Sequence, residues 1–229
     1  MKNPEINLLN VDCMEYMKGL PDKAFELAIV DVPYGIGENG STNHTRSKLA
    51  KPKDYKAFYG LDASAPDQLY FDELLRVSKN QIIWGANHFI SKIPLDSPCW
   101  IIWDKVNGEN DFADCELAWS SFKTAARKVK FMWHGFMQGS GFDGKMQGNK
   151  ALNETRIHPT QKPVALYKWL LHNYAKPGDK ILDTHGGSMS IAIACHQMGF
   201  DLTLCELDKD YYEAGVKRFK EQTKQLALL

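Results

Sequence analysis

The chain has 229 residues, of which 44% are hydrophobic, and its 28 basic and 28 acidic residues leave no formal net charge. This length suits one α/β domain with insertions and is sufficient to bury a hydrophobic core. The sequence has no run of 18 apolar residues and no hydrophobic signal core at its start, so we expect neither a membrane span nor a secretory signal. A net charge of zero also means that the chain lacks the strongly basic balance that is the usual electrostatic footprint of nucleic-acid binding.

Hydrophobic periodicity predicts an alternation of strands and helices along the chain. The expected strands are 6–11, 25–31, 81–84, 100–104, 116–120, 128–133, 180–183 and 201–205, and the expected helices are 13–20, 69–78, 163–175, 189–198 and 209–224. Residues 36–62 predict a long functional or mobile loop, and residues 134–156, which contain five glycines, predict a flexible insertion or a linker.

The cysteines are scattered along the chain without paired spacing. They are Cys13, Cys99, Cys115, Cys195 and Cys205. This arrangement predicts buried thiols in a reducing cytoplasm, because disulfide frameworks and zinc sites need cysteines at regular spacings. We therefore expect a cytoplasmic protein without a metal centre.

An acidic and aromatic tetrapeptide follows the second strand. The hydrophobic run Phe25–Val30 is followed directly by Asp31-Val32-Pro33-Tyr34. Pro33 ends the strand, because proline has no N–H for the ladder and fixes φ. Open α/β sheets bind ligands at the carboxyl ends of their strands, so Asp31 and Tyr34 are candidate site residues. The alternative is a strand cap, in which Asp31 accepts local N–H groups and Tyr34 packs.

A glycine loop forms a second candidate site near the end of the chain. The strand 180–183 leads into Thr184-His185-Gly186-Gly187-Ser188, and a helix follows. Glycines let a ligand approach the backbone, and a helix N-terminus offers free N–H groups. Glu206 ends the next strand, 19 positions after Gly187, where an acid can accept both hydroxyls of a ribose. This unit favours a bound nucleoside over an ordinary βα turn, without separating dinucleotides from other nucleosides.

The two motifs, in this order, resemble those of the beta-class DNA amino-methyltransferases. The segment 31–34 is similar to the Asp-Pro-Pro-Tyr catalytic motif, with Val32 in place of the first proline. The segment 158–163, His-Pro-Thr-Gln-Lys-Pro, matches the family's stretch before the cofactor strand and is the most specific match. The resemblance covers nearly the whole chain. It implies a single, circularly permuted domain of the Rossmann-like class I methyltransferase fold, with a mostly parallel sheet and helices on both faces.

The resemblance also implies a reaction, the transfer of a methyl group from S-adenosylmethionine to the N6 amine of a flipped adenine in double-stranded DNA. Asp31 would accept one amine N–H, the Val32 carbonyl would accept the other, and Tyr34 would stack on the base. Together with Pro33 these residues form the implied catalytic motif. The implied cofactor-binding residues are Asp12, Thr160, Gln161, Lys162, Asp183, Gly186, Gly187, Ser188 and Glu206. Asp12 has an alternative role as the N-cap of the helix that follows it.

Two departures from the family pattern bear on function. Val32 keeps the carbonyl through which the family makes its contact. Met189 stands where the family usually has glycine, so its bulk is expected to weaken cofactor binding or crowd the helix start. Cytosine-N4 enzymes of the family usually begin the catalytic motif with Ser, so Asp31 favours adenine. The alternatives are a cytosine-N4 methyltransferase, a catalytically impaired DNA-binding relative, and a nucleotide-binding dehydrogenase, although the loop lacks that class's glycine triad.

The parts of the chain expected to contact DNA are indicated by the resemblance and by the distribution of charge. The resemblance implies that residues 106–156 carry target recognition, a region short enough that a homodimer could extend it. Two basic clusters could meet DNA phosphates or be solvated faces. They comprise Arg46, Lys48, Lys51, Lys53 and Lys56, and Lys123, Arg127, Lys128 and Lys130, with the aromatic residues Tyr55, Phe58, Tyr59 and Trp133 nearby. The family includes members of restriction-modification systems.

Overall fold

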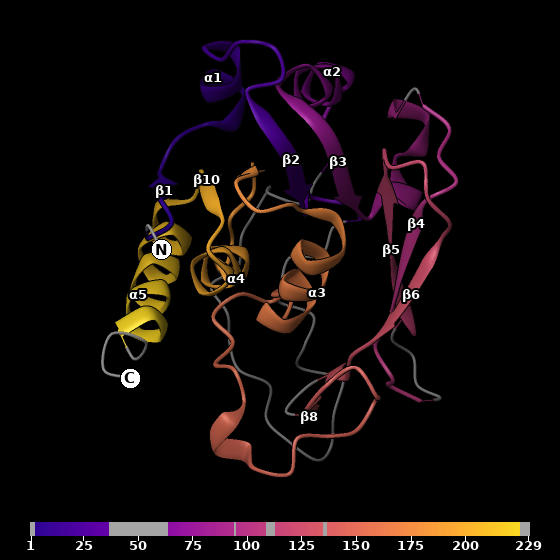
Figure 1. Cartoon of the computed structure of the whole chain (residues 1–229), viewed down its shortest axis with the longest axis vertical. Helices are drawn as coiled ribbons and strands as arrows, with labels where there is room; N and C mark the ends of the chain where they lie inside the picture. Colours follow the sequence, from indigo (N-terminus) through magenta and orange to yellow (C-terminus); the bar gives the residue numbers. More distant parts are fainter. Residues whose placement is uncertain (1–2, 37–63, 94, 109–112, 135–136, 225–229) are drawn as a thin grey trace.

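The computed structural model describes residues 3–36, 64–93, 95–108, 113–134 and 137–224. An eight-stranded sheet forms the centre of the molecule, and a separate pair of short strands lies at one end (Figure 1). The strands of the main sheet are β1 (Ile6–Leu9), β2 (Phe25–Val30), β3 (Ser78–Trp84), β4 (Trp100–Asp104), β5 (Cys115–Ser120), β6 (Arg127–Lys130), β9 (Lys180–Asp183) and β10 (Asp201–Cys205). The α-helices are α1 (Cys13–Lys18), α2 (Gln68–Val77), α3 (Val164–Tyr174), α4 (Ser190–Met198) and α5 (Lys209–Lys224). The short pair comprises β7 (Trp133–His134) and β8 (Met137–Gln138), and the 3-10 turns are η2 (Ala86–His88), η3 (Ile90–Lys92) and η4 (Lys150–Leu152).

The main sheet has the strand order β1-β10-β9-β2-β3-β5-β4-β6. All neighbours pair in parallel except β5, which runs antiparallel to both β3 and β4. The chain leaves β9 for β10 on one side and leaves β2 for β3 on the other. Adjacent strands whose connections diverge in this way form a topological switch point, and open α/β sheets bind ligands just beyond the carboxyl ends of such strands.

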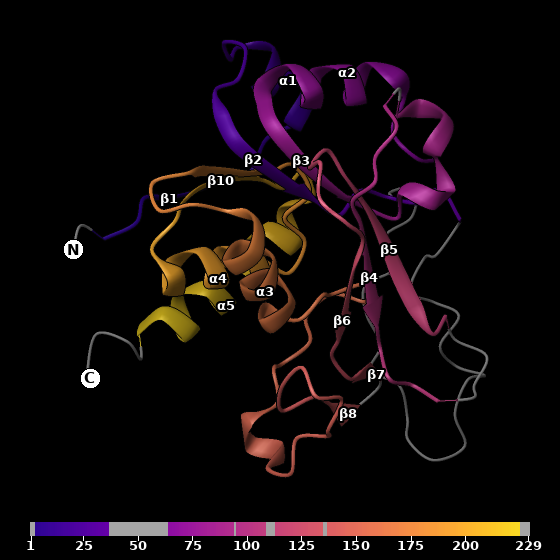
Figure 2. The same cartoon turned by 45° about the vertical axis from the view of Figure 1, so that its right-hand side comes forward.

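Helices cover both faces of the sheet, as the resemblance implied. In β2, Leu27 and Ile29 pack into a core shared with α3 and α4, whereas Ala28 and Val30 pack into a core shared with α1 and α2. Figure 2 shows these two helix groups on opposite sides of β2 and β3. Successive strand residues point to opposite faces, so the part of β2 that is covered on both sides, residues 27–30, is apolar throughout.

Most element boundaries agree with the sequence predictions, and the bounds of β4, β9, β10 and α5 agree fully. The predicted strand 128–133 is instead divided between β6 and β7, in two separate sheets. The alternation continues across the break, because Val129, Phe131 and Trp133 are all buried. The hydrophobic pattern therefore could not reveal that the chain changes sheets there.

The predicted insertion 134–156 has structure of its own, as β8, η4 and a bridge between Gly139 and Met146 show. Within 106–156, β5 and β6 belong to the main sheet, and the described residues that follow Lys130 lie outside it. The recognition role of this region stays a prediction. Most of the predicted loop 36–62 lies outside the described residues.

The cysteine prediction needs one correction. All five cysteines are free thiols, but only Cys99, Cys195 and Cys205 are buried. Cys13 is half-buried in the first turn of α1, and Cys115 is exposed where it begins β5. Among the helices that the structure describes, none combines the length and apolar character needed to cross a bilayer.

Candidate active site

The two predicted motifs meet at the carboxyl edge of the sheet. Ala28 of β2 lies opposite Leu182 of β9, so the chains that continue beyond these neighbouring strands carry both motifs to the switch point. The segment 158–162 contacts both motifs. A Cβ built on Gly187 would lie 3.8 Å from the His158 ring, and Lys162 forms an ion pair with Asp31. The juxtaposition of the catalytic motif and the glycine loop is therefore present in the fold.

Asp31 is the centre of a buried polar cluster. Lys162 Nζ lies 2.5 Å from Asp31 Oδ1 and 3.0 Å from Glu116 Oε2, with only 3% of the lysine side chain exposed. The Tyr34 hydroxyl donates a hydrogen bond to the same Asp31 Oδ1 at 2.9 Å, and Lys105 Nζ lies 2.5 Å from the other oxygen of Glu116. Two carboxylates are thus matched by two ammonium groups beside the tyrosine.

The charges in this cluster are unequally stabilised. Burial would raise the pKa of Glu116, but Lys162 and Lys105 outweigh it and hold that pKa at about 2. Burial raises the pKa of Asp31 above its usual value, and the Glu116 carboxylate adds to the shift while Lys162 opposes it. The pKa of Lys162 is raised, because its two carboxylate partners outweigh the effect of burial. Glu116 has two cationic partners and Asp31 has one, so Asp31 is the better proton acceptor of the two.

The ring of Tyr34 is held by the loop that follows β3. A Cβ on Gly85 would overlap the tyrosine Cε1, so only glycine permits this approach. The ring stacks on the exposed His88, with 5.1 Å between centroids and 15° between planes. Lys162 Nζ lies 5.6 Å from the Tyr34 ring and 5.3 Å from the Trp84 ring, within cation–π range. The aromatic face predicted to receive a base is thus already oriented by its neighbours.

The glycine loop is fixed by the end of β10. Gly186 N–H donates to the Cys205 carbonyl, and a Cβ on Gly186 would overlap a Leu204 methyl, so the loop packs against the strand only with glycine there. Gly187 N–H donates to Glu206 Oε2 at 2.7 Å, and Glu206 Oε1 accepts from Asp208 N–H. A carboxylate offers about four lone-pair directions, so these bonds leave acceptor capacity for ribose hydroxyls. The ribose role of Glu206 stays a prediction.

Asp183 is the strongest electrostatic feature of the loop. Its side chain is 2% exposed, and burial, with the carboxylates Asp31 and Glu206 nearby, raises its pKa to about 8. Its Oδ1 accepts from His185 N–H at 3.0 Å, and within the described residues no lysine or arginine forms an ion pair with it. A buried carboxyl that forms no ion pair with a described lysine or arginine, beside a glycine turn, suits the ammonium end of an amino-acid-like ligand.

The side chain of Met189 packs against α5. Its backbone is left-handed, with φ 57°, which explains why the family usually has glycine here. Its side chain is fully buried against α5, where a Cβ on Gly215 would lie 2.8 Å from the methionine Cγ. Gly215 therefore provides the space for the Met189 side chain, and the expected effect of Met189 on cofactor binding stays a prediction.

The segment 158–163 is organised mainly by its own contacts. The Gln161 side chain accepts from Ile157 N–H and donates to the Thr155 carbonyl, and its backbone carbonyl accepts from Trp133 Nε1. Thr160 is exposed and contacts His158, whose pKa burial and Lys162 lower to about 4. The predicted cofactor contacts of Thr160, Gln161 and Lys162 stay predictions. Lys162 itself lies against the catalytic motif.

Asp12 caps α1, the alternative that the sequence left open. Its Oδ1 accepts from Met14 N–H at 2.7 Å and from Glu15 N–H at 3.1 Å. A cap does not exclude a ligand on the second oxygen, and the predicted contact with the cofactor adenine stays a prediction.

Sequence reasoning missed Glu116, Lys105 and His88. Glu116 and Lys105 reach the site because β5 inserts antiparallel between β3 and β4, a pairing that strand periodicity cannot show. A usable signal was present for Glu116, a charged residue within a strand that was predicted from its apolar neighbours.

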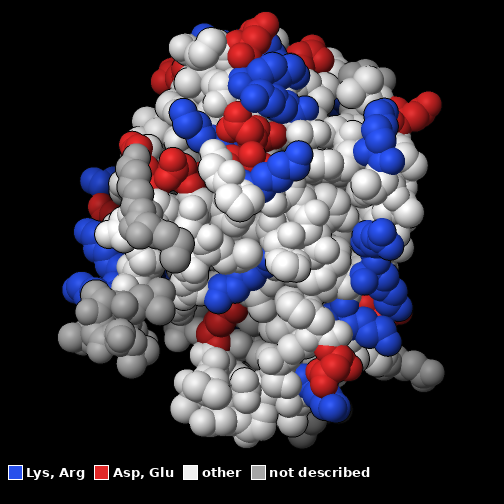
Figure 3. Space-filling view, viewed as in Figure 1, with Lys and Arg blue, Asp and Glu red and all other residues white. Residues whose placement is uncertain are grey.

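One of the two predicted basic clusters lies on the edge strand of the sheet. Lys123, Arg127, Lys128 and Lys130 are all exposed on or beside β6. Figure 3 shows basic side chains along this edge, at the right of the view. The other cluster lies outside the described residues. Trp133 is 5% exposed and bonded to Gln161, so it cannot serve as a surface aromatic for DNA.

The strand order of the main sheet, its single antiparallel strand β5 and the glycine loop at the switch point define a class I methyltransferase fold. Solved structures share this fold. The complex of M1.HpyAVI with S-adenosylmethionine matches 93% of this chain and 98% of its own, with a TM-score of 0.57 and 20% identity. TTHA0409 of Thermus thermophilus matches 96% and 95%, with a TM-score of 0.54 and 14% identity. The cytosine-N4-specific PvuII DNA methyltransferase matches 97% and 93%, with a TM-score of 0.54 and 13% identity.

Sequence comparisons agree with the fold. The model of the N6/N4 DNA methylase family matches residues 108–217. The Type II methyltransferase M.HinfI of Haemophilus influenzae is 23% identical over 93% of this chain and 68% of its own length. The DNA adenine methyltransferase YhdJ of Escherichia coli K12 is 33% identical, over 29% of this chain and 23% of its own length. These similarities support the expected assignment of the chain as an S-adenosylmethionine-dependent DNA amino-methyltransferase.

Proposed function

We propose that this methyltransferase acts on the N6 amine of adenine in double-stranded DNA, after the adenine has been flipped from the duplex. The observation that carries the proposal is a buried carboxylate, Asp31, at the carboxyl end of β2, directly followed by the Val32 carbonyl. Adenine specificity is also supported by similarity to the DNA adenine methyltransferase YhdJ.

An exocyclic amine is a poor nucleophile because its lone pair is delocalised into the ring. Two acceptors on its N–H groups favour the pyramidal amine of the transition state, and such acceptors act most strongly when they are already in place. We assign one N–H to Asp31 and the other to the Val32 carbonyl. The bonds from Lys162 and Tyr34 both end on Asp31 Oδ1 and fix the carboxylate, so Oδ2 is the oxygen assigned to the amine.

Bound S-adenosylmethionine supplies an electrophilic methyl group. We propose that Glu206 holds its ribose hydroxyls, that Asp12 meets its adenine, and that Asp183 with Gly186, Gly187 and Ser188 surrounds its methionine end. The features that fit this ligand are the buried carboxyl of Asp183, which no described cation pairs, and the close backbone approach at the glycines.

The proton that the methylated amine loses needs an acceptor. Asp31 is placed for this role, and burial raises its pKa above its usual value, which favours proton uptake. Tyr34 is assigned to stack on the flipped base. The partner is double-stranded DNA, with the exposed basic residues on and beside β6 as candidate phosphate contacts.

The test is to identify the product. Duplex DNA is incubated with the protein and methyl-labelled S-adenosylmethionine, digested to nucleosides and separated. We expect label in N6-methyldeoxyadenosine. Label in N4-methyldeoxycytidine would support the alternative, cytosine-N4 specificity. The cytosine-N4-specific PvuII DNA methyltransferase has a similar fold. S-adenosylmethionine binding without any transfer would indicate the catalytically impaired relative.

A further inference from the structure

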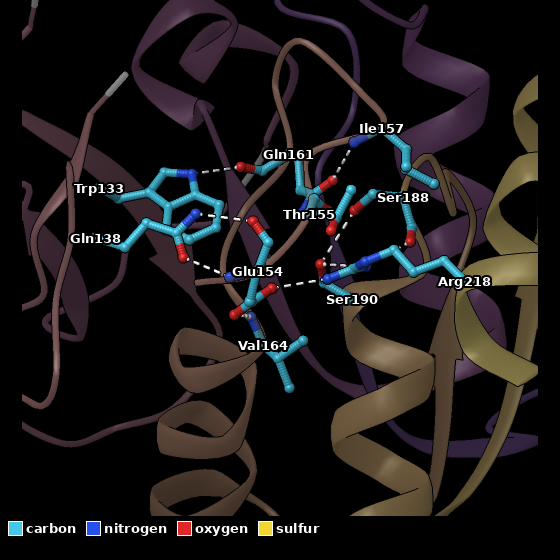
Figure 4. Close-up of polar contacts among 10 residues, drawn as sticks. All are labelled: Trp133, Gln138, Glu154, Thr155, Ile157, Gln161, Val164, Ser188, Ser190 and Arg218. Carbon is cyan, nitrogen blue, oxygen red and sulfur yellow. Dashed lines mark hydrogen bonds and ion pairs between the residues drawn. The ribbon is translucent and has the colours of Figure 1, made fainter. Parts of the chain in front are cut away.

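Arg218 of α5 is a buried arginine that reaches back to the glycine loop. Its side chain is 4% exposed, yet it lies in a helix whose outer face is highly charged. Its Nη1 donates to the Ser188 carbonyl at 2.7 Å and to Ser190 Oγ at 3.0 Å (Figure 4). The arginine therefore contacts both the last residue of the predicted cofactor loop and the first residue of α4.

Glu154 holds the other arm of this arginine. Its Oε2 accepts from Arg218 Nη2 at 2.7 Å, and its Oε1 accepts from Val164 N–H, at the start of α3, at 2.9 Å. The backbone of Glu154 is itself clamped by the Gln138 side chain, which accepts from its N–H and donates to its carbonyl. Figure 4 shows this chain of contacts running from β8 to the loop.

A role in packing alone does not explain this pair. Burying two charges is costly, and apolar residues of similar volume often stabilise a protein as well or better. Burial lowers the pKa of Arg218, and the Glu154 carboxylate opposes that shift. An apolar side chain could fill the space but could not donate to the Ser188 carbonyl, so what the arginine adds is a fixed position for that peptide group.

The loop is then held from two sides. Glu206 accepts the N–H of Gly187, and Arg218 donates to the carbonyl of the next residue, Ser188. Each contact restricts rotation of the backbone between them, where glycine alone would allow many conformations. A loop fixed before its ligand arrives loses less conformational entropy on binding.

We infer that Arg218 is a positioning residue for S-adenosylmethionine, acting through the Ser188 carbonyl, and that Glu154 fixes the arginine in place. This inference rests on the proposed assignment of residues 186–188 to the cofactor. Arg218 does not touch the reacting atoms, so its loss should weaken cofactor binding more than it slows a saturated enzyme.

The test measures cofactor affinity by titration calorimetry, and kcat and KM for S-adenosylmethionine with duplex DNA, in Arg218→Met and Glu154→Gln. The loss of a charge-assisted bond predicts a roughly tenfold weaker affinity and a KM raised in step for Arg218→Met. Glu154→Gln should shift affinity in the same direction by less, because the arginine remains. In both variants kcat should change less than KM.

Arg76, whose side chain is 29% exposed, offers a control with similar contacts. It also pairs with a carboxylate, Glu73, and donates to two backbone carbonyls, those of Leu20 and Met17, but none of these residues belongs to the loop. Arg76→Met should lower stability and leave cofactor affinity at the wild-type value. A similar loss of affinity in Arg76→Met would show that general destabilisation is responsible and would overturn the inference.

Further outcomes are decisive. A folded Arg218→Met that binds S-adenosylmethionine like the wild type overturns the inference and leaves the proposed function intact. Failure of the wild type to bind the cofactor would instead contradict the assigned cofactor site. If Arg218→Met does not fold, Arg218→Lys and Glu154→Gln decide the matter in the same assay. Unchanged affinity in both overturns the inference, and weakened affinity in either, with a normal circular dichroism spectrum, supports it.

Discussion

Lys162 of the segment 158–163 forms an ion pair with Asp31, although the two residues are far apart in the sequence. The lysine Nζ lies 2.5 Å from Asp31 Oδ1, and both side chains are largely buried. The lysine belongs to the segment that also lies beside Gly187, and the aspartate begins the catalytic motif. This contact links the catalytic motif to the glycine loop, because the segment that supplies Lys162 to the Asp31 carboxylate also borders that loop.

We expect Lys162→Met to destabilise the protein and abolish methyl transfer. The change leaves Asp31 and Glu116 together in a buried site without their shared cation, and breaking a buried pair in this way costs about 3 kcal/mol or more. Urea unfolding measures the loss. Adding Glu116→Gln should restore part of the stability, since it removes the second carboxylate. Lys209→Met, which breaks an exposed pair with Glu213, should cost less than about 1 kcal/mol.

The hydroxyl and the ring of Tyr34 should contribute separately. Tyr34→Phe loses the bond to Asp31 and keeps the aromatic face, whereas Tyr34→Ala loses both. Base stacking is worth roughly 1–3 kcal/mol, so kcat/KM for duplex DNA should fall further in the alanine variant, by about 5- to 150-fold relative to phenylalanine. Equal activity in the two variants would show that the ring does not receive the base.

Met189 and Gly215 should be energetically coupled. Gly215→Ala places a methyl group 2.8 Å from the Met189 Cγ, and such overpacking costs about 1–3 kcal/mol. In a Met189→Gly background the same substitution should cost less, because its main steric partner is gone, and alanine favours the helix. A double-mutant cycle by chemical unfolding gives the coupling. Additive effects would mean that the contact carries no energy.

The raised pKa of Asp183 predicts a pH dependence of stability. The folded protein holds this proton up to about pH 8, whereas the unfolded chain releases it near the usual value of 3.8. The stabilisation from the proton is complete below pH 3.8 and is lost as the pH rises towards 8. The free energy of unfolding of the wild type, relative to Asp183→Asn, should therefore decline across that range. A flat difference would show that the carboxyl is ionised in the folded protein.

The sequence predicted the elements and the two motifs well because the strands at the switch point are apolar runs ended by distinctive turns. Periodicity identified β9 and β10 fully, and Gly186 marked the loop between β9 and α4. It could not show that Lys162 would lie on Asp31, nor that Glu116 would join them, because both contacts depend on the order of strands in the sheet. The division of strand 128–133 was hidden for a related reason, since buried residues alternate through the break.

The role of Asp31 as the acceptor of the amine is tested most directly by Asp31→Ala. Transfer of labelled methyl from S-adenosylmethionine to duplex DNA is measured in single-turnover conditions, and cofactor affinity is measured on the same preparation. We predict that transfer is lost and that the dissociation constant for S-adenosylmethionine stays near the wild-type value, because the loop at Gly186 is held independently by β10 and Glu206. Methyl transfer at the wild-type rate in Asp31→Ala would contradict the assignment of this residue.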